Sequence, residues 1–331
     1  MSALLVDLGG THLRLGIWHE AAAPRVMYRR RLRNFIEAST RGDIWQEIIS
    51  SISDFAAGMR HLIPAAAPVV ISFPGPVLNG SHIIDAPTVS GPSTTLPELQ
   101  SIVAERTGRR VYVLNDISAA AWHVSRCVEA QRFVVVTISS GIGSKIYDRD
   151  HFRGVIDEVA YAGEIGHAKV DESSEAPMCD CGGRGHLGAI SSGRGILRFA
   201  RQTAQSDPSF RSSLCVRQFQ ATADSLNNEE HLVPAAKARD EWALSVVREC
   251  TAPLARLLLQ CIIAAGLQRV VIIGGFALSL GEPYRVILQE EMMKRCDYRV
   301  LSGRLRDFIL MGDDDACLLG TAAFASRLCS L

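Results

Sequence analysis

The fold is already visible in residues 3–17, which read Ala3-Leu4-Leu5-Val6-Asp7-Leu8-Gly9-Gly10-Thr11-His12-Leu13-Arg14-Leu15-Gly16-Ile17. An apolar run ends at Asp7 and is followed by a Gly-Gly-Thr turn. Beyond the turn, every second residue is Leu or Ile, which is the period of a β-strand. The pattern predicts two strands joined by a tight turn, at which the glycines leave backbone N–H groups exposed.

Strands alternate with helices along the rest of the chain. We expect strands at residues 69–72, 111–114, 133–138 and 270–273, and an amphipathic helix at residues 43–60. Thr95 and Glu98 are spaced as a capping box for a further helix, which Gly108 ends. Glycines and carboxylates gather at the strand ends, so we predict an α/β fold with its site at those ends.

The composition is typical of a globular protein, and its formal net charge is zero. It has 331 residues, 47% of them apolar and 21% charged, with 35 basic and 35 acidic residues. This length suits two domains, and the neutral total argues against a nucleic-acid or anionic-membrane partner. The basic run Arg29-Arg30-Arg31-Leu32-Arg33 reads either as a phosphate-binding patch or as a solvated strand face, and we favour the strand face.

Neither a signal peptide nor a membrane span is evident. No basic segment followed by a long apolar run stands at the start, and charged and amide residues interrupt the apolar residues 254–275. Nine cysteines are scattered through the chain, apart from Cys179 and Cys181. Reduced thiols or a metal site are therefore favoured over a disulfide framework, and we expect a cytoplasmic protein.

Three glycine-rich turns each follow a predicted strand, at residues 7–11, 139–143 and 274–275. Such turns let backbone N–H groups approach a phosphate without interference from a Cβ atom. None matches the Walker A or the GxGxxG pattern. Three together, with an acid in the first, predict a nucleotide site of another kind. Its candidate residues are Asp7, Gly9, Gly10, Thr11, Ser140, Gly141, Gly274 and Gly275.

Five motifs in order resemble those of the ROK sugar kinases, a family of the actin/hexokinase-like ATPase superfamily. They are Asp7-Leu8-Gly9-Gly10-Thr11, Phe73-Pro74-Gly75-Pro76-Val77, Asn115-Asp116, Gly163-Glu164-Ile165-Gly166-His167 and Cys179-Asp180-Cys181-Gly182. The resemblance runs from residue 4 to about residue 325 and implies two α/β domains around a cleft. We expect residues 1–116 plus about 310–331 to form the smaller domain, and residues 117–309 the larger one. The resemblance also implies ATP, Mg²⁺, a sugar acceptor and a homodimer.

By this resemblance Asp116 is the general base that takes the proton of the attacking hydroxyl. One carboxylate at the hydroxyl and donors around the phosphates are the groups that phosphoryl transfer needs. Taken alone, Asn115-Asp116 would read as a turn after a strand. The implied acceptor-binding residues are Gly75, Thr88, Asn115, Asp116, Glu164 and His167.

The same resemblance places nucleotide and Mg²⁺ at the first two turns. Asp7 would help to hold Mg²⁺ through water, because this ion keeps most of its waters. Gly10 and Thr11 would meet the phosphates, and Ser140 keeps a hydroxyl where the family usually has Thr. Lys145 is unusual for the pattern, and we favour a surface position for it over a contact with the nucleotide.

A zinc set is implied by His167, Cys179, Cys181 and His186. Two thiolates and two imidazoles can close a tetrahedral structural site, although the family normally has Cys where His186 stands. We expect a structural zinc that holds the His167 loop. The alternative is a decayed site with two free thiols in a turn.

One further departure lies on the sugar side. Gly188 stands where the family carries a glutamate that binds sugar hydroxyls, and Ile117-Ser118 replaces the usual Ala-Asn. Loss of that carboxylate weakens the case for glucose. We therefore predict an ATP-dependent kinase for a hexose or hexose-like polyol, with a C7-cyclitol of the valiolone type or an amino or N-acyl sugar as alternative acceptors. A non-catalytic sugar sensor and a ROK regulator are the alternatives from other classes.

Overall fold

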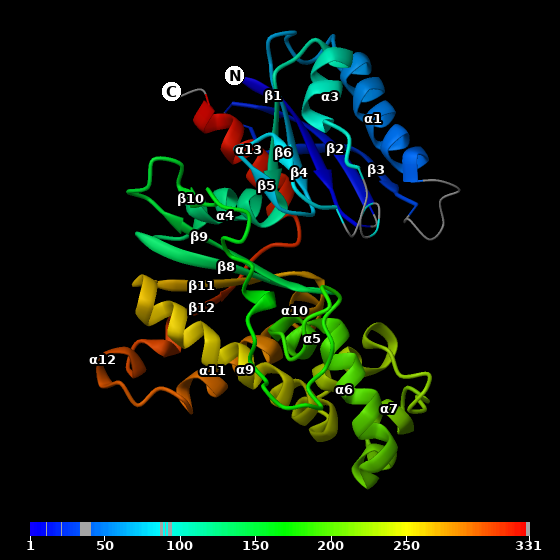
Figure 1. The fold of residues 1–331 in the computed structure, drawn as a ribbon, viewed down its shortest axis with the longest axis vertical. Helices are drawn as coiled ribbons and strands as arrows, with labels where there is room; N and C mark the ends of the chain where they lie inside the picture. The colour runs from blue at the N-terminus through cyan, green and yellow to red at the C-terminus, as the bar shows by residue number, and fades with distance from the viewer. Residues whose placement is uncertain are drawn as a thin grey trace. The chain divides into compact units, whose positions relative to one another are not determined.

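The computed structural model describes residues 1–10, 12–20, 22–33, 41–86, 89, 91 and 95–328, which form two compact α/β units (Figure 1). The first unit comprises Met1–Glu129, Asp150–Ala162 and Asp315–Leu331. The second comprises Ala130–Arg149 and Gly163–Asp314. The chain therefore passes between the units several times.

The first unit is built on a five-stranded sheet in the order β3-β2-β1-β4-β7. These strands are β1 (Ser2–Leu8), β2 (His12–His19), β3 (Arg25–Arg31), β4 (Val69–Phe73) and β7 (Val111–Asn115). β1 and β2 pair antiparallel, with Asp7 opposite Arg14, whereas β4 and β7 run parallel to β1 and to each other. The two strands and the turn predicted from residues 3–17 are confirmed.

Two helix pairs accompany this sheet. α1 (Arg41–Gly58) and α3 (Leu99–Thr107) share one apolar cluster with β1, in which Val6, Ile48 and Val103 are fully buried. α4 (Asp116–Cys127) packs on α13 (Ala316–Leu328), and α13 contacts β1 and β4. The short strands β5 (Val77–Leu78), β6 (His82–Ile83) and β10 (Val155–Ile156) complete this unit.

The packing of α4 moves the domain boundary relative to the expected one. A Cβ atom at Gly320 of α13 would lie 1.7 Å from the carbonyl oxygen of Ala119 in α4, so the two helices meet backbone to backbone. Glycine permits this approach because it has no side chain. α4 consequently belongs to the first unit, which extends to Glu129 instead of ending at residue 116.

The second unit repeats the arrangement of a hairpin followed by parallel strands. Its strands β9 (Ile142–Asp148), β8 (Arg132–Ile138), β11 (Arg269–Ile273) and β12 (Ile309–Met311) are neighbours in that order. β8 and β9 are antiparallel, whereas β11 is parallel to both β8 and β12. In both units the carboxyl ends of the parallel strands are therefore the edge at which ligands are expected.

The helices of the second unit bury the apolar face of this sheet. Val136 of β8, Leu258 of the long helix α9 (Glu241–Ala265) and Leu288 of α11 (Glu282–Met293) share one core. Figure 1 shows α9 and α11 side by side, next to β11 and β12. The remaining elements are η1 (Ile165–His167), α5 (Leu187–Ser191), α6 (Gly193–Ser206), η2 (Pro208–Ser212), α7 (Leu214–Arg217), η3 (Asn228–Leu232), α8 (Val233–Lys237), α10 (Gly275–Leu280), α12 (Arg299–Ser302) and η4 (Leu305–Asp307).

The predicted capping box is wrong. α3 begins at Leu99 with Glu98 as the residue before it, and no side chain caps this end. Pro97 disfavours helical backbone at the residue before it, so the helix cannot start near Thr95. Gly108 does end α3, with a left-handed φ of 68°.

Two other expectations concern the surface. β3, which carries the basic run, exposes most of its side chains, so the solvated strand face is confirmed. Arg30 and Arg33 pair with Glu47 of α1. Within the described part of the chain, no helix is both long and apolar enough to cross a bilayer.

Candidate functional site

In the first unit, predicted site residues meet at the carboxyl ends of parallel strands. Asn115 ends β7, Asp116 begins α4, and Gly75 follows β4. The Nδ2 atom of Asn115 donates to the carbonyl of Gly75 at 2.9 Å and to Oδ1 of Asp116 at 3.0 Å. A Cβ atom at Gly75 would lie 2.3 Å from the carbonyl oxygen of Asp85, so this close approach requires glycine.

The Asn115 side chain is fully engaged within the unit. Its Oδ1 accepts from the backbone N–H groups of Ile117 at 3.1 Å and Ser118 at 3.2 Å, which makes it the N-cap of α4. With its two donated bonds, the amide uses all four of its hydrogen-bonding positions. Oδ1 of Asp116 also accepts from the N–H of Ile117 at 2.8 Å, so this carboxylate is held by two donors.

Asp7, at the end of β1, is buried and bonded to a cation. Oδ2 of Asp7 accepts from Nε of Arg14 at 2.7 Å, and the same guanidinium pairs with Asp315. Burial raises the pKa of Asp7, and the positive charge of Arg14 only partly offsets that increase. A single carboxylate at a strand end fits an Mg²⁺ ion that keeps several waters.

In the second unit, the other two glycine turns also stand at strand ends. The turn with Ser140 and Gly141 follows β8, and its Ser139 carbonyl accepts from the N–H of Gly193 at 2.8 Å. Gly274 follows β11 with a left-handed φ of 98°. A Cβ atom there would lie 2.6 Å from the N atom of Ile138, so only glycine fits beside β8. Gly275 is the first residue of α10.

The loop that carries Glu164 and His167 is clamped onto β9 by two glycines. Cβ atoms at Gly163 and Gly166 would lie 1.8 Å and 2.1 Å from the carbonyl oxygens of Ser144 and Ile142. The N–H of Ser144 donates to the Gly163 carbonyl at 2.8 Å. The spacing of the two glycines in the motif therefore has a packing reason.

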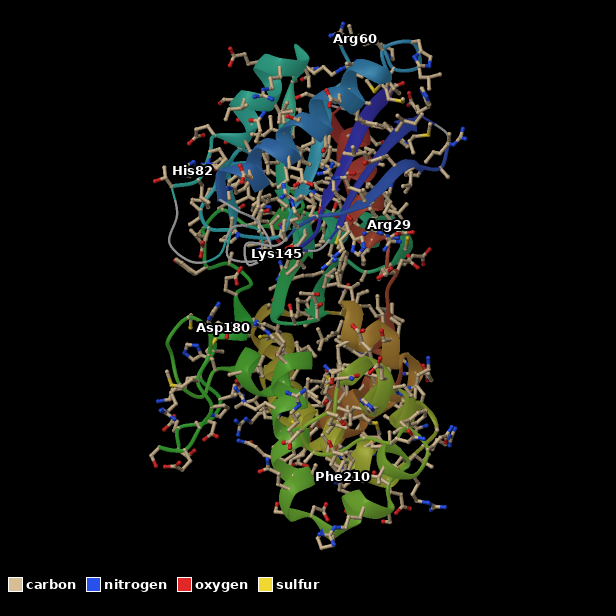
Figure 2. All side chains as sticks on the ribbon, turned by 90° about the vertical axis from the view of Figure 1, so that its right-hand side faces the viewer. Arg29, Arg60, His82, Lys145, Asp180 and Phe210 are labelled. Atoms are coloured by element: carbon tan, nitrogen blue, oxygen red, sulfur yellow. The ribbon has the colours of Figure 1, made fainter. Side chains whose placement is uncertain are left out.

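Lys145 departs from its expected surface position. Lys145, which is labelled in Figure 2, is buried, with only 3% of its surface exposed. Its Cδ atom would lie 3.3 Å from a Cβ atom placed at Gly163. Because successive residues of a strand point to opposite faces, Lys145 of β9 faces the side of the sheet opposite Ser144.

The four predicted zinc ligands come together in the second unit. The ligand atoms of His167, Cys179, Cys181 and His186 all lie within 4.8 Å of one another. Nδ1 of His167 is 4.0 Å from Sγ of Cys179, and Nδ1 of His186 is 3.2 Å from Sγ of Cys181. Tetrahedral zinc with usual bond lengths separates such atoms by roughly 3.3–3.8 Å. The two thiols and two imidazoles therefore fit zinc in number and kind, and the two N–S separations of 3.2 and 4.0 Å lie just below and just above this range.

The loop between these ligands is shaped by glycines. A Cβ atom at Gly183 would lie 2.1 Å from the His186 ring, and Gly185 has a left-handed φ of 72°. Asp180, labelled in Figure 2, pairs with Arg194 at 2.7 Å beside the two cysteines. Burial raises the pKa of the Cys179 thiol. The described cysteines are all free thiols.

Gly188 lies in α5 against the loop that ends at His167. A Cβ atom there would lie 3.2 Å from the carbonyl oxygen of Gly166, which is a tight contact. A side chain at position 188 would thus begin directly beside the loop backbone.

Two of the predicted site residues are not described by the structure, and one residue at the site was missed. Thr11 and Thr88 lie outside the described residues. Arg14 was not predicted as a site residue. It could have been found from the hairpin register, which sets it opposite Asp7.

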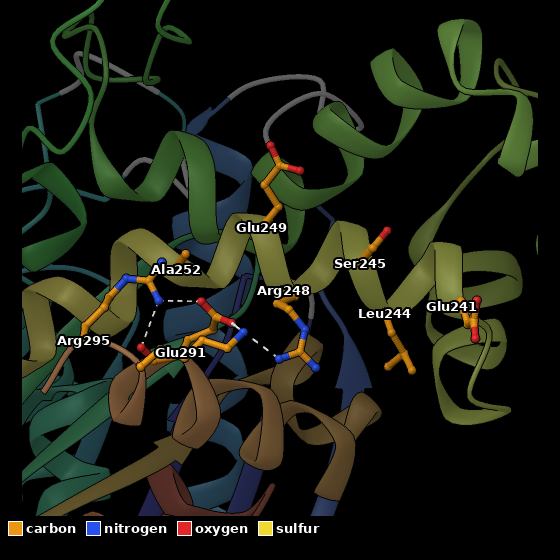
Figure 3. Close-up of a pocket in the computed structure, with 9 residues that line it drawn as sticks. Glu241, Leu244, Ser245, Arg248, Glu249, Ala252, Glu291 and Arg295 are labelled. Atoms are coloured by element: carbon orange, nitrogen blue, oxygen red, sulfur yellow. Dashed lines mark hydrogen bonds and ion pairs between the residues drawn. The ribbon is translucent and has the colours of Figure 1, made fainter. Parts of the chain in front are cut away.

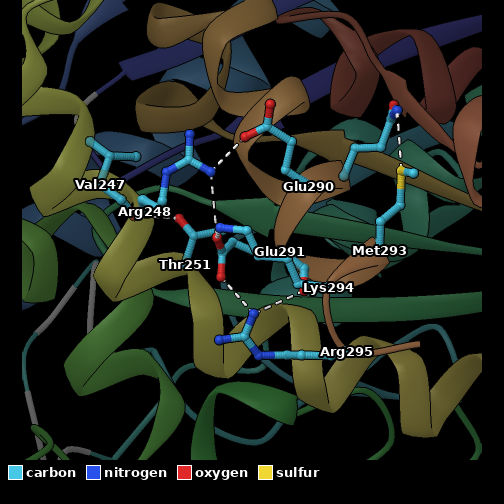
Figure 4. Close-up of polar contacts among 9 residues, drawn as sticks. Val247, Arg248, Thr251, Glu290, Glu291, Met293, Lys294 and Arg295 are labelled. Atoms are coloured by element: carbon cyan, nitrogen blue, oxygen red, sulfur yellow. Dashed lines mark hydrogen bonds and ion pairs between the residues drawn. The ribbon is translucent and has the colours of Figure 1, made fainter. Parts of the chain in front are cut away.

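A separate hollow of about 610 Å³ lies along α9 and α11 and contains none of the predicted site residues (Figure 3). One of its lining residues is Glu291, whose side chain is 5% exposed. It pairs with Lys294 at 2.8 Å, Arg295 at 2.5 Å and Arg248 at 3.4 Å (Figure 4). This network joins the two helices and has a structural role.

Glu291→Gln is expected to lower the free energy of unfolding at pH 7 by about 1–2 kcal/mol. Breaking a fully buried ion pair would cost more stability. Here the three cations that pair with Glu291 are partly exposed, so water weakens each ion pair. Burial by itself raises the pKa of Glu291, but hydrogen bonds from Lys294 and Arg295 outweigh it, so this pKa lies below its usual value of 4.5. The contribution is complete above pH 4.5 and is lost as the pH falls through the folded-state pKa.

Thermal unfolding of both proteins between pH 7 and pH 3 checks this prediction. The difference in Tm should be largest near neutral pH and shrink in acid. A difference that persists unchanged at pH 3 would contradict it. Glu249→Gln, an exposed change in the same hollow, is the control.

Comparison with known proteins agrees with this geometry. The sequence pattern of the ROK family matches residues 3–327. A protein of Streptomyces hygroscopicus subsp. jinggangensis named C(7)-cyclitol 7-kinase is 34% identical, over 98% of this chain and 93% of that protein. A glucokinase of Thermotoga maritima is 28% identical, over 84% of this chain and 82% of that protein. The crystal structure of a ROK family glucokinase from Streptomyces griseus, in complex with glucose and AMPPNP, matches with a TM-score of 0.73 at 21% identity, over 99% of this chain and 100% of that one.

Two sheets of hairpin-plus-parallel strands, each with glycine turns at its carboxyl edge, define an actin/hexokinase-like ATPase fold. The chain belongs to the ROK family. The resemblance inferred from its motifs is confirmed.

Proposed function

We propose that this chain is an ATP-dependent kinase that phosphorylates a hydroxyl group of a sugar or cyclitol, and that its preferred acceptor is a C7-cyclitol. The observation that carries the proposal is the 34% identity, over 98% of the chain, with a protein named C(7)-cyclitol 7-kinase. The 28% identity with a glucokinase keeps a hexose as the second candidate acceptor.

In this proposal Asp116 is the general base. The acceptor oxygen forms a bond to the γ-phosphorus of ATP while the bond to the β–γ bridging oxygen breaks, and ADP leaves. Asp116 takes the hydroxyl proton. The hydrogen bonds from Asn115 and Ile117 to its Oδ1 support this role, because they fix the carboxylate in one orientation.

The neighbouring residues divide into two kinds. Because Asn115 uses all four hydrogen-bonding positions inside the first unit, we assign it the task of orienting Asp116 and the Gly75 loop. Glu164 and His167 remain the proposed acceptor-binding side chains. His167 can serve both of its predicted roles, since a metal at Nδ1, the atom nearer Cys179, leaves Nε2 for an acceptor hydroxyl.

Gly188 supports an acceptor other than glucose. A pocket that hydrogen-bonds substrate hydroxyls distinguishes between substrates through its buried polar groups. At position 188, α5 has a glycine and therefore no polar side chain for such a hydrogen bond. A Cβ atom added at position 188 would lie only 3.2 Å from the Gly166 carbonyl oxygen, so the loop packs closely on α5.

Asp7, Gly9, Gly10, Ser140, Gly141, Gly274 and Gly275 are the proposed nucleotide side of the site. Bound Mg²⁺ would neutralise charge on the phosphates, with Asp7 as its protein partner. The left-handed backbone at Gly274 supports close approach of a phosphate to the end of β11.

Zinc, held by His167, Cys179, Cys181 and His186, is proposed as a structural ion that fixes the His167 loop. The two-Cys, two-His set and its spacing support this. Cytoplasmic location and a homodimer stay predictions from the sequence.

The test is ADP release with Mg-ATP across aldohexoses, amino and N-acetyl hexoses, and C7-cyclitols. We expect the highest kcat/KM on a C7-cyclitol. A higher kcat/KM on glucose would favour the hexose alternative. No turnover on any acceptor, with measurable ATP binding, would contradict a kinase and favour the sensor.

A further inference from the structure

The start of α6 packs against the glycine turn that follows β8. The N–H of Gly193, the first residue of α6, donates to the Ser139 carbonyl at 2.8 Å. Nε of Arg194, the next residue, donates to the Ser140 carbonyl at 2.7 Å. Two consecutive residues of the helix therefore hold two consecutive carbonyl groups of the turn.

These two hydrogen bonds set the direction of the N–H groups in the turn. In a planar trans peptide, the carbonyl oxygen and the N–H of the following residue point in opposite directions. Because the carbonyls of Ser139 and Ser140 point toward α6, the N–H groups of Ser140 and Gly141 point away from it. Among the described residues, no backbone carbonyl accepts from either N–H, and Ser140 is exposed. Successive N–H groups turned outward in this way are suited to bind phosphate oxygens.

Arg194 is itself anchored by the loop that carries the proposed zinc ligands. Its Nη2 atom pairs with the Asp180 carboxylate at 2.7 Å, while its Nε donates to Ser140. Asp180, labelled in Figure 2, stands between Cys179 and Cys181. Both members of the ion pair are exposed, so the pair by itself adds little stability. Its effect is geometric, because two separate partners hold the planar guanidinium in one orientation.

Other contacts fix the start of α6 without the Arg194 side chain. Oγ of the buried Ser192 accepts from the N–H of Gly195 at 3.2 Å and caps the helix. Nδ2 of Asn228 donates to the Gly193 carbonyl at 2.9 Å. Loss of the Arg194 side chain should therefore leave the helix in place and release only one carbonyl of the turn.

We propose that Arg194 is a positioning residue for the nucleotide, which orients the peptide between Ser140 and Gly141 for phosphate binding. Asp180 holds the guanidinium in place for this task. The inference rests on the proposed kinase function and adds a residue of α6 to the nucleotide side of the site. Without Arg194 the peptide is free to rotate, and its N–H is no longer directed at a phosphate oxygen.

Arg194→Ala tests the proposal by calorimetry with AMPPNP and with adenosine, which has no phosphates. We expect the affinity for AMPPNP to fall by roughly 3- to 10-fold, the contribution of one hydrogen bond, and the affinity for adenosine to stay the same. In steady-state assays the KM for ATP should rise by the same factor, whereas the acceptor KM should not change. Arg194→Lys should restore part of the affinity, because an ammonium group can still donate to the Ser140 carbonyl.

Arg201→Ala is the matched control. Arg201 is another exposed arginine of α6, about two helical turns further on, and its Nε donates to the Leu226 carbonyl at 2.8 Å. This change removes the same kind of bond away from the turn, so nucleotide affinity should not change.

A double-variant cycle tests the role of Asp180. Asp180→Ala should weaken AMPPNP binding less than Arg194→Ala does. The double variant should bind AMPPNP no more weakly than Arg194→Ala alone, because Asp180 acts on the nucleotide only through Arg194.

Three outcomes would contradict these expectations in different ways. Unchanged AMPPNP affinity in Arg194→Ala, with normal binding by the wild type, would overturn the inference and leave the kinase function standing. An equal loss of affinity for AMPPNP and adenosine, with a lower Tm, would also overturn it, because Arg194 would then only stabilise the fold. A wild-type protein that binds no AMPPNP would contradict the proposed function itself.

Discussion

Asp116→Asn is expected to lower kcat by roughly 10²–10⁴-fold, the usual contribution of a positioned general base. The amide cannot take the hydroxyl proton. Its oxygen can still accept the hydrogen bonds that Asn115 Nδ2 and the N–H of Ile117 donate to the carboxylate, so the start of α4 should keep its shape. Acceptor and ATP affinities should therefore change little.

Steady-state ADP release gives kcat for this variant, and calorimetry gives the two affinities. Asp224→Asn, an exposed change of the same type in the second unit, is the control. Turnover within a few-fold of the wild type would exclude Asp116 as the base. Loss of affinity for the acceptor together with a lower Tm would show a structural defect instead.

Cys181→Ser is expected to abolish binding of about one zinc ion per chain, because a four-ligand structural site loses a thiolate. The loop after Cys179 would lose its tie to His167, and we expect the Tm to fall by roughly 5–10 °C, as for a loss of a few kcal/mol. His186→Cys should keep the metal, since three thiolates and one imidazole form an equally common structural set.

Metal content by mass spectrometry and thermal unfolding with and without a chelator test this site. The chelator should lower the Tm of the wild type but leave that of Cys181→Ser unchanged. Cys127→Ser, an exposed thiol in the first unit, is the control. If the wild-type protein contains no zinc and the chelator does not change its Tm, the result would favour the alternative in which the site binds no metal and the two cysteines are free thiols.

Local patterns account for most of the elements. The alternation around the first glycine turn predicted β1 and β2, and buried strands were found before each of the other site turns. The predictions differ from the structure where an adjacent residue or a packing contact determines the local structure. Pro97 prevented the helix start at Thr95, and packing of α4 on α13 shifted the domain boundary. Lys145 is buried although its type usually lies at the surface.

The sequence by itself determined the fold class, the family and the kinds of candidate side chains, because periodicity, glycine turns and metal-ligand types are local properties. Only the tertiary structure decided which of them meet. It joined Asn115 to Gly75 and Ser118 to Asp157, pairs that lie 40 and 39 residues apart, and Arg14 to Asp315, 301 residues apart. Such contacts depend on strand order and helix packing, which a local pattern does not contain.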